Sequence, residues 1–245
     1  VSVMWANNEV GTVQPVGEVA ELARRHDALL HVDAVQALGK CPVSLEDVPA
    51  DLLTVTAHKL GGPVGIGLLH AAEGVELAPL TYGGAQEGGL WPGTQNPLAA
   101  VGFAEAARLM VEALPASARR WSDLRDGLAE RLRAGIPDLR FHGAGAARRL
   151  PNLLSVGIPG CDASSLLVSL DLEGVAASSG SACSSGSSSP SHVLDAMGVL
   201  DDAPEDYAVL RLSLGPGTHE DDVERAADAV VRVAGRLRSG SPPAR

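Results

Sequence analysis

The chain has 245 residues, with 19 Lys and Arg against 30 Asp and Glu, so its formal net charge is −11 at neutral pH. Apolar residues make up 45% of the sequence, which supplies a buried core and excludes an intrinsically disordered chain. The acidic balance argues against a nucleic-acid-binding protein, and no apolar stretch approaches the roughly 20 residues of a membrane span. The cysteines, Cys41, Cys161 and Cys183, are far apart in the sequence. They predict neither a disulfide framework nor a paired metal motif, and a reducing, cytoplasmic compartment fits best.

The first part of the chain predicts a largely parallel sheet of the α/β class. Apolar runs at strand length alternate with a helical pattern near 16–23, and the expected strands cover 1–6, 28–32, 52–56 and 65–69. Strands that alternate with helices favour a doubly wound sheet, which places its ligands beyond the carboxyl ends of the strands. Asp33 and Lys59 both fall at such ends.

A Gly-rich loop at 82–96 separates this part from a second alternation of helices and strands. Helical patterns at 98–114 and 118–134 are separated by Pro115, which predicts a domain boundary near residue 115. Beyond it we expect strands at 153–156, 175–177 and 209–213, and helices at 164–170, 191–197 and from Thr218, with Asp221 as its capping-box partner, to Leu237. The predicted domains are therefore residues 1–115 and 116–238, followed by a disordered tail at 239–245.

Lys59 and Asp33 are the first candidates for chemistry. A lysine directly after an apolar strand can be desolvated and form a Schiff base, although a solvated lysine at a strand end is the simpler reading. A carboxylate at the end of the neighbouring strand could pair with the protonated pyridine nitrogen of pyridoxal phosphate (PLP). Taken alone, Asp33 also fits a helix N-cap.

Cys183 and Arg211 are the second pair of candidates. Small residues surround Cys183 from Ser178 to Ser189, which predicts an exposed loop and a thiol used as a nucleophile or sulfur carrier. Cys41 and Cys161 have settings typical of structural cysteines. Arg211 is a charge within an apolar strand, so it either extends from a sheet edge or binds an anion such as a carboxylate.

Taken together, these segments resemble the cysteine desulfurases of the NifS and IscS type, within the class V aminotransferase group of PLP enzymes. Six stretches carry the resemblance, in the family's order and along nearly the whole chain: ANNEVGTVQP (6–15), HVDAVQALGK (31–40), TAHKLGGPVGIG (56–67), GTQN (93–96), SSGSACSSGSSSPSHVLDAMG (178–198) and RLSLG (211–215). The resemblance implies a type I PLP-dependent transferase fold. Residues 1–115 would then be part of a PLP-binding large domain, and 116–238 a small α/β domain that carries the cysteine loop.

The resemblance also implies a role for each matching residue. For PLP, these are Lys59 as the Schiff-base lysine, Asp33 on the pyridine nitrogen, Gln36 on the phenolic oxygen, Asn8 beside the ring, and Thr56 and His58 on the phosphate. Thr94 would reach the phosphate bound by the other subunit of a homodimer. Arg211, with Asn8, would bind the carboxylate of L-cysteine, and Cys183 would accept its sulfur as a persulfide while L-alanine is released. The only metal contact this allows is a transient iron–sulfur contact at Cys183.

The sulfur acceptor would be an iron–sulfur scaffold, a tRNA-thiolation enzyme or a thiocofactor pathway. The sequence also departs from the family's usual pattern, because Gly88, Trp91 and Gln95 replace two arginines and a glutamate, and Val64 replaces a lysine. Family members usually carry further N-terminal residues that supply a phosphate loop and a ring-stacking histidine. The chain is therefore expected to begin inside a domain and to bind PLP weakly by itself.

Two alternatives stay open at this point. One is a related PLP enzyme, such as a selenocysteine lyase or another class V aminotransferase, although an aminotransferase needs no thiol at Cys183. The other is a truncated or decayed homologue without catalytic activity. The lost arginines favour it, whereas the presence of Asp33, Lys59, Cys183 and Arg211 opposes it.

Overall fold

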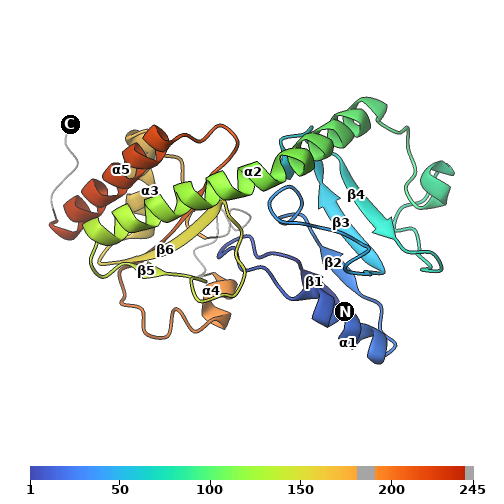
Figure 1. Cartoon of the computed structure of the whole chain (residues 1–245), viewed down its shortest axis with the longest axis horizontal. Coiled ribbons are helices and arrows are strands. Elements are labelled where there is room, and N and C mark those ends of the chain that lie inside the picture. Colours follow the sequence, from blue (N-terminus) through green and yellow to red (C-terminus); the bar gives the residue numbers. More distant parts are fainter. Residues whose placement is uncertain (181–190, 241–245) are drawn as a thin grey trace. The chain divides into compact units, whose positions relative to one another are not determined.

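In the computed structural model, which describes residues 1–180 and 191–240, the chain forms two units, each with a sheet of its own (Figure 1). Unit 1 consists of Val1–Ala6 and Gln14–Leu114, and unit 2 consists of Asn7–Val13 and Pro115–Arg245. The segment Asn7–Val13 thus follows the first strand of unit 1 in sequence but packs with unit 2. The predicted α/β class is confirmed.

The sheet of unit 1 is mainly parallel, as predicted. Its strands lie in the order β1 (Ser2–Met4), β2 (His31–Asp33), β3 (Leu52–Thr56) and β4 (Gly67–Ala71). The first three are parallel and β4 runs antiparallel to β3. The helix α1 (Val16–Arg25) links β1 to β2 and buries an apolar face that includes Val16, Ala20 and Ala23. Two short 3-10 helices follow, η1 (Ala57–Leu60) directly after β3 and η2 (Gln86–Gly89) within the Gly-rich loop.

The helix α2 (Pro97–Gly135) is continuous through Pro115, so the prediction of two helices separated at Pro115 is wrong. Proline removes one helical hydrogen bond and costs about 3 kcal/mol inside a helix. Buried side chains on both sides offset this cost, namely Ala99 and Phe103 before the proline and Trp121, Leu124, Leu128 and Leu132 after it. The division between the two units nevertheless falls between Leu114 and Pro115.

Unit 2 contains an antiparallel sheet in the order β5 (Arg140–Phe141), β6 (Leu153–Pro159) and β7 (Tyr207–Ser213). The helix α3 (Ala163–Leu172) packs against β7 and against α5 (Glu220–Arg238), and α4 (His192–Ala196) is a single short helix (Figure 1). The two-residue strand β5 was not predicted, because so short a strand carries no apolar alternation.

Two predictions about this unit need correction. Residues 175–177 form no strand, because they follow directly on the C-terminal turn of α3. Val175 N–H donates to Leu170 O in that turn, and Gly174 has a φ of 79°. Only Ser178 then forms a bridge to β7. The last helix has His219 as its N-cap, one residue later than the predicted cap Thr218, because the Thr218 hydroxyl instead accepts a hydrogen bond from Gly215 N–H. Its capping partner is Asp222, which accepts from His219 N–H.

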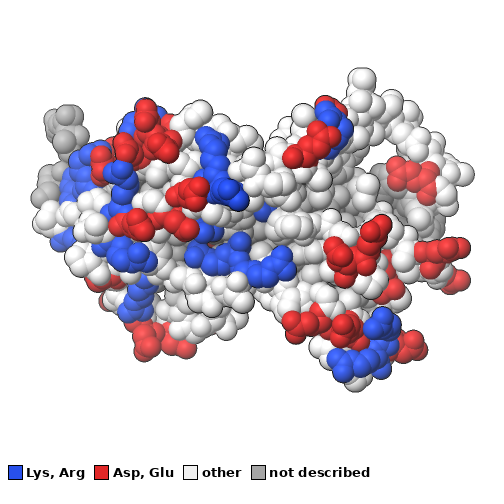
Figure 2. All heavy atoms as spheres, in the orientation of Figure 1, with Lys and Arg blue, Asp and Glu red and all other residues white. Residues whose placement is uncertain are grey.

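Charged side chains of both signs lie interspersed on the face drawn in Figure 2. Several of them form ion pairs, such as Arg232–Glu173 and Arg238–Asp138 in unit 2. Exposed pairs of this kind each contribute at most about 1 kcal/mol to stability. Within the described ranges, no helix combines the length and apolar character needed to cross a membrane.

A buried polar cluster lies between β5, β6 and β7 of unit 2. The His142 ring contacts the Ser155 hydroxyl through Nδ1 at 3.0 Å and the Tyr207 hydroxyl through Nε2 at 2.9 Å. Burial, with a smaller contribution from the charge of Arg140, lowers the pKa of His142 from 6.5 to about 4. The ring is therefore neutral at physiological pH, and its two hydroxyl contacts compensate for its removal from water.

This cluster predicts a loss of stability in acid. Between pH 6.5 and pH 4 the unfolded chain binds a proton at His142 that the folded chain does not, so the free energy of unfolding falls as the pH falls through this range. The loss reaches about 3 kcal/mol at most. Urea unfolding at several pH values should show it, and His142→Gln should flatten that part of the profile. The same change at the exposed His26 is the control; an equal acid dependence in His142→Gln would contradict the assignment.

Candidate active site

The candidate residues of unit 1 lie where parallel strands of its sheet end. Asp33 is the last residue of β2 and Thr56 the last of β3, and the register pairs Asp33 with Thr54. The carboxyl ends of the two strands therefore lie at the same edge of the sheet. In open α/β sheets this edge is where ligands bind.

Asp33 is held by the turn that follows it. Its Oδ1 accepts a hydrogen bond from Val35 N–H at 2.9 Å, and Ala34 N–H donates to Thr54 O on β3. The side chain is only partly buried. Asp33 thus caps a turn, whereas the alternative prediction was a helix N-cap. Its carboxylate stays at the end of β2.

Lys59 lies on η1, directly after β3. The Thr56 hydroxyl donates to Ile66 O at 3.2 Å and contacts His58 Nδ1 at 3.0 Å, which ties both side chains to the strand end. His58 and Lys59 are exposed. The turn ends at Gly61, whose φ of 78° favours glycine.

Lys40 is a buried lysine within reach of the charge of Lys59, and the sequence patterns did not single it out. Its Nζ is 3.4 Å from both the backbone oxygen and the side-chain Oε1 of Gln36. Burial first, and then the positive charge of Lys59, lower the pKa of Lys40 from 10.5 to about 8. A signal was available, because Lys40 and Lys59 are the only two lysines in the sequence.

The turn that carries Gln36 and Lys40 packs against η1. Gly39 has a φ of 73°, and a Cβ there would lie 3.0 Å from atoms of Leu60 and Met110. Only glycine combines this conformation with so close an approach. Gln36, Lys40 and Lys59 are therefore brought together within unit 1.

Unit 2 brings together two further candidates, Asn8 and Arg211. Arg211 lies on β7, and its Nη1 donates to Asn8 O at 2.9 Å while Nη2 donates to the Ser178 hydroxyl at 3.3 Å. Asn8 itself lies in a tight turn in which Asn7 Oδ1 accepts from the backbone N–H groups of Glu9 and Val10. The Arg211 guanidinium is thereby held in one orientation by the Asn8 backbone.

Glu9 is a second buried polar residue that no sequence pattern indicated. Its side chain is 1% exposed and accepts a hydrogen bond from the Ser191 hydroxyl at 2.5 Å. The same carboxylate oxygen, Oε2, would lie 3.1 Å from a Cβ at Gly180. Glu9 thus contacts the described residues on both sides of 181–190. Cys183 falls within that segment and lies outside the described residues.

Thr94 is exposed in the loop after η2, and within the described ranges no hydrogen bond joins it to the other candidates. The residues that depart from the family pattern are also at the surface, including Trp91 and Val64, which are 61% and 83% exposed. Gly88 has a φ of 68°, a conformation in which an arginine would be strained.

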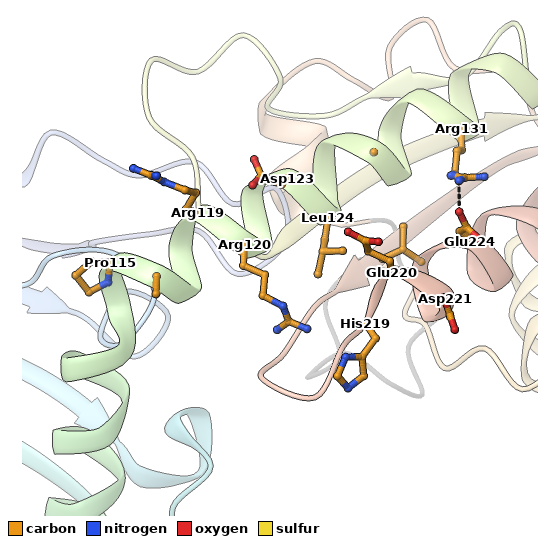
Figure 3. Close-up of a pocket in the computed structure, with 13 residues that line it drawn as sticks. Pro115, Arg119, Arg120, Asp123, Leu124, Arg131, His219, Glu220, Asp221 and Glu224 are labelled. Atoms are coloured by element: carbon orange, nitrogen blue, oxygen red, sulfur yellow. Dashed lines mark hydrogen bonds and ion pairs between the residues drawn. The ribbon is translucent and has the colours of Figure 1, made fainter.

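A groove of about 1150 Å³ on unit 2 contains none of these candidates (Figure 3). It lies between α2 and the start of α5, and Arg131 forms an ion pair with Glu224 there. Arg120 donates to the backbone oxygens of Pro216 and Thr218. Two of its arginines, Arg120 and Arg131, thus already bind groups within the protein, and we assign no chemistry to this groove. Among the described residues, no group of His, Cys, Asp and Glu could hold a metal ion.

The donor set of unit 1 fits PLP. A lysine amine can bind the aldehyde, a carboxylate can pair with the pyridinium nitrogen, and an amide can donate to the phenolic oxygen. Lys59, Asp33 and Gln36 supply these three groups, and Thr56 and His58 supply donors for the phosphate.

Comparisons with known proteins agree with this chemistry. The cysteine desulfurase IscS of Clostridium botulinum is 38% identical over 243 residues, which is 99% of this chain and 61% of the relative. The NifS-like protein of Rickettsia africae superposes with a TM-score of 0.86 at 30% identity, covering 96% of this chain and 61% of that structure. The structure of SspA in complex with cysteine matches with a TM-score of 0.64 at 30% identity, covering 88% and 58%.

The chain thus spans about 60% of the length of the relatives it matches. The structural likeness confirms the expected fold of the NifS-like PLP-dependent enzymes. The Aminotransferase class-V family matches residues 1–226, and its members are PLP-dependent. The chain therefore belongs to the class-V aminotransferase family.

Proposed function

We propose that the protein is a PLP-dependent cysteine desulfurase. The observation that carries the proposal is that Asp33, Gln36 and Lys59 all lie at or just beyond the carboxyl ends of β2 and β3. The chain is also 38% identical to an enzyme of that name. The net reaction converts L-cysteine and the thiol of Cys183 into L-alanine and a persulfide on Cys183. The C–S bond of the substrate breaks, an S–S bond to Cys183 forms, and the substrate carbon is reduced as the sulfur is oxidised, so no external oxidant is needed.

PLP, when bound, supplies the electron sink that weakens bonds at the substrate α-carbon. In this proposal Lys59 holds the cofactor aldehyde and, once released by substrate, moves the α-proton. Asp33 keeps the pyridine nitrogen protonated because its carboxylate favours the positive charge. Gln36 donates to the phenolic oxygen, and Thr56 and His58 bind the phosphate. Thr94 binds the phosphate of the other subunit in a homodimer.

Arg211 and Asn8 form the proposed substrate subsite. A guanidinium recognises a carboxylate through two parallel N–H donors, and the Asn8 backbone oxygen already orients the Arg211 fork. The solved structure of SspA with cysteine supports L-cysteine as the substrate. Cys183 receives the sulfur and passes it to an iron–sulfur scaffold, a tRNA-thiolation enzyme or a thiocofactor pathway in the cytoplasm.

The proposal predicts which lysine holds PLP. Reduction of the PLP-loaded, full-length gene product with borohydride should attach the cofactor to Lys59, and peptide mass spectrometry can read the position because the sequence printed here has only one other lysine, Lys40. In Lys59→Ala the visible absorption band of bound PLP should disappear. Attachment at Lys40 in the wild type would contradict the assignment.

The proposal also predicts the effect of removing the Cys183 thiol. Cys183→Ala should retain the PLP absorption band and abolish persulfide formation from L-cysteine, because only the acceptor thiol is removed. The matched control is Cys161→Ala, which removes a buried thiol of the same unit. Alanine formation and persulfide labelling should be measured together. Unchanged persulfide and alanine formation in Cys183→Ala would contradict the role of Cys183 as acceptor, whereas a wild-type protein that transaminates L-cysteine without releasing its sulfur would favour another class V aminotransferase.

A further inference from the structure

We propose that Lys40 is a positioning residue whose ammonium group orients the side-chain amide of Gln36, so that the amide N–H groups face the phenolic oxygen of bound PLP. The inference rests on the proposed function, because it assumes that unit 1 binds PLP. It assigns a task to a buried lysine that the reaction itself does not use.

Lys40 contacts both the backbone and the side chain of Gln36. The ammonium nitrogen lies 3.4 Å from Gln36 Oε1 and 3.4 Å from Gln36 O, so it bridges the side chain and the backbone of one residue. Lys40 is 9% exposed. A lysine at this depth loses much of its hydration and needs partners within the protein.

The turn keeps this contact in place. Lys40 N–H and Cys41 N–H both donate to Ala37 O at 2.9 Å, and Leu38 N–H donates to Ala34 O at 3.0 Å. Gly39 packs against Leu60 at a distance that leaves no room for a side chain. The backbone is therefore held on both sides of Gln36 and Lys40, and the hydrogen bond from Lys40 acts on the side chain of Gln36.

The chemistry of the two groups settles that orientation. An ammonium group has three donors and no acceptor, whereas a glutamine amide has one acceptor atom and one donor atom. With a pKa of about 8, Lys40 is mainly an ammonium at pH 7, so of the two amide atoms it can bind only the oxygen. The Nε2 donors are then directed away from Lys40. A phenolic oxygen that carries negative charge needs such a donor, and a flipped amide would present an oxygen to it instead.

A double-mutant cycle separates this role from a merely structural one. PLP affinity is measured by titrating the visible band of the full-length gene product at pH 7 in the wild type, Lys40→Met, Gln36→Ala and the double variant. We expect Lys40→Met to weaken PLP binding by about three- to tenfold, the range for one hydrogen bond. It should also shift the band toward that of Gln36→Ala. In the Gln36→Ala background, Lys40→Met should have no further effect.

Two more variants keep the test decisive if Lys40→Met folds poorly. Lys40→Arg, which also has only donors, should restore the wild-type band and affinity. Gln36→Glu keeps an acceptor for Lys40 but presents oxygen to the phenolic group, so it should weaken PLP binding. An unchanged affinity in Lys40→Met or Gln36→Glu would overturn the proposal, as would an equal effect of Lys40→Met in both backgrounds.

The readouts also distinguish this inference from the proposed function. PLP affinity and band position report on Lys40 and Gln36, whereas alanine release from L-cysteine reports on desulfuration. A wild-type protein that binds PLP but releases no alanine would refute the proposed function, and the affinity cycle would still decide the role of Lys40. A wild-type protein without any PLP band would overturn both.

Discussion

The backbone pairing of β2 with β3 is the constraint on which the cofactor-binding part of the site depends. Because the two strands are parallel and Asp33 is paired with Thr54, the chain leaves both strands at the same edge of the sheet. The turn after Asp33 and the 3-10 helix after Thr56 then start side by side. A slip of one residue between the two strands would place Asp33 and Thr56 on opposite faces of the sheet. The proximity of the candidate residues is therefore a property of the ladder rather than of any one side chain.

Two buried residues with ionisable side chains, Lys40 and Glu9, form hydrogen bonds close to the candidate residues. Each gives up hydration, which proteins tolerate only where the group finds partners. Lys40 contacts Gln36, and Glu9 contacts Ser191, whose hydroxyl also accepts from Leu194 N–H at the start of α4. Neither residue belongs to the set that reacts in the proposed mechanism. Both therefore act, if at all, through the described residues that they contact, Gln36 for Lys40 and Ser191 for Glu9.

The sequence patterns predicted most of the elements, and their failures have physical causes. The apolar run at 52–56 has the same bounds as β3, whereas the run at 28–32 begins three residues before β2 (His31–Asp33). Pro115 suggested a helix end, but the burial of Phe103 and Trp121 on either side outweighs one lost hydrogen bond. Residues 175–177 looked like a strand, yet the backbone of Val175 is used to close α3. In both cases a tertiary or neighbouring interaction decided the outcome, and a local pattern does not record it.

The sequence by itself determined the chemical groups of the site: a lysine and an aspartate at strand ends, an arginine inside a strand, and a cysteine among small residues, in an order that matches one enzyme family. These follow from residue type and spacing, which are local. Only the tertiary structure decided which groups face one another. It showed that Lys40 is buried within reach of the charge of Lys59, and that Arg211 donates to the backbone oxygen of Asn8, 203 positions away. Burial and long-range hydrogen bonds arise when distant segments pack, so no single segment encodes them.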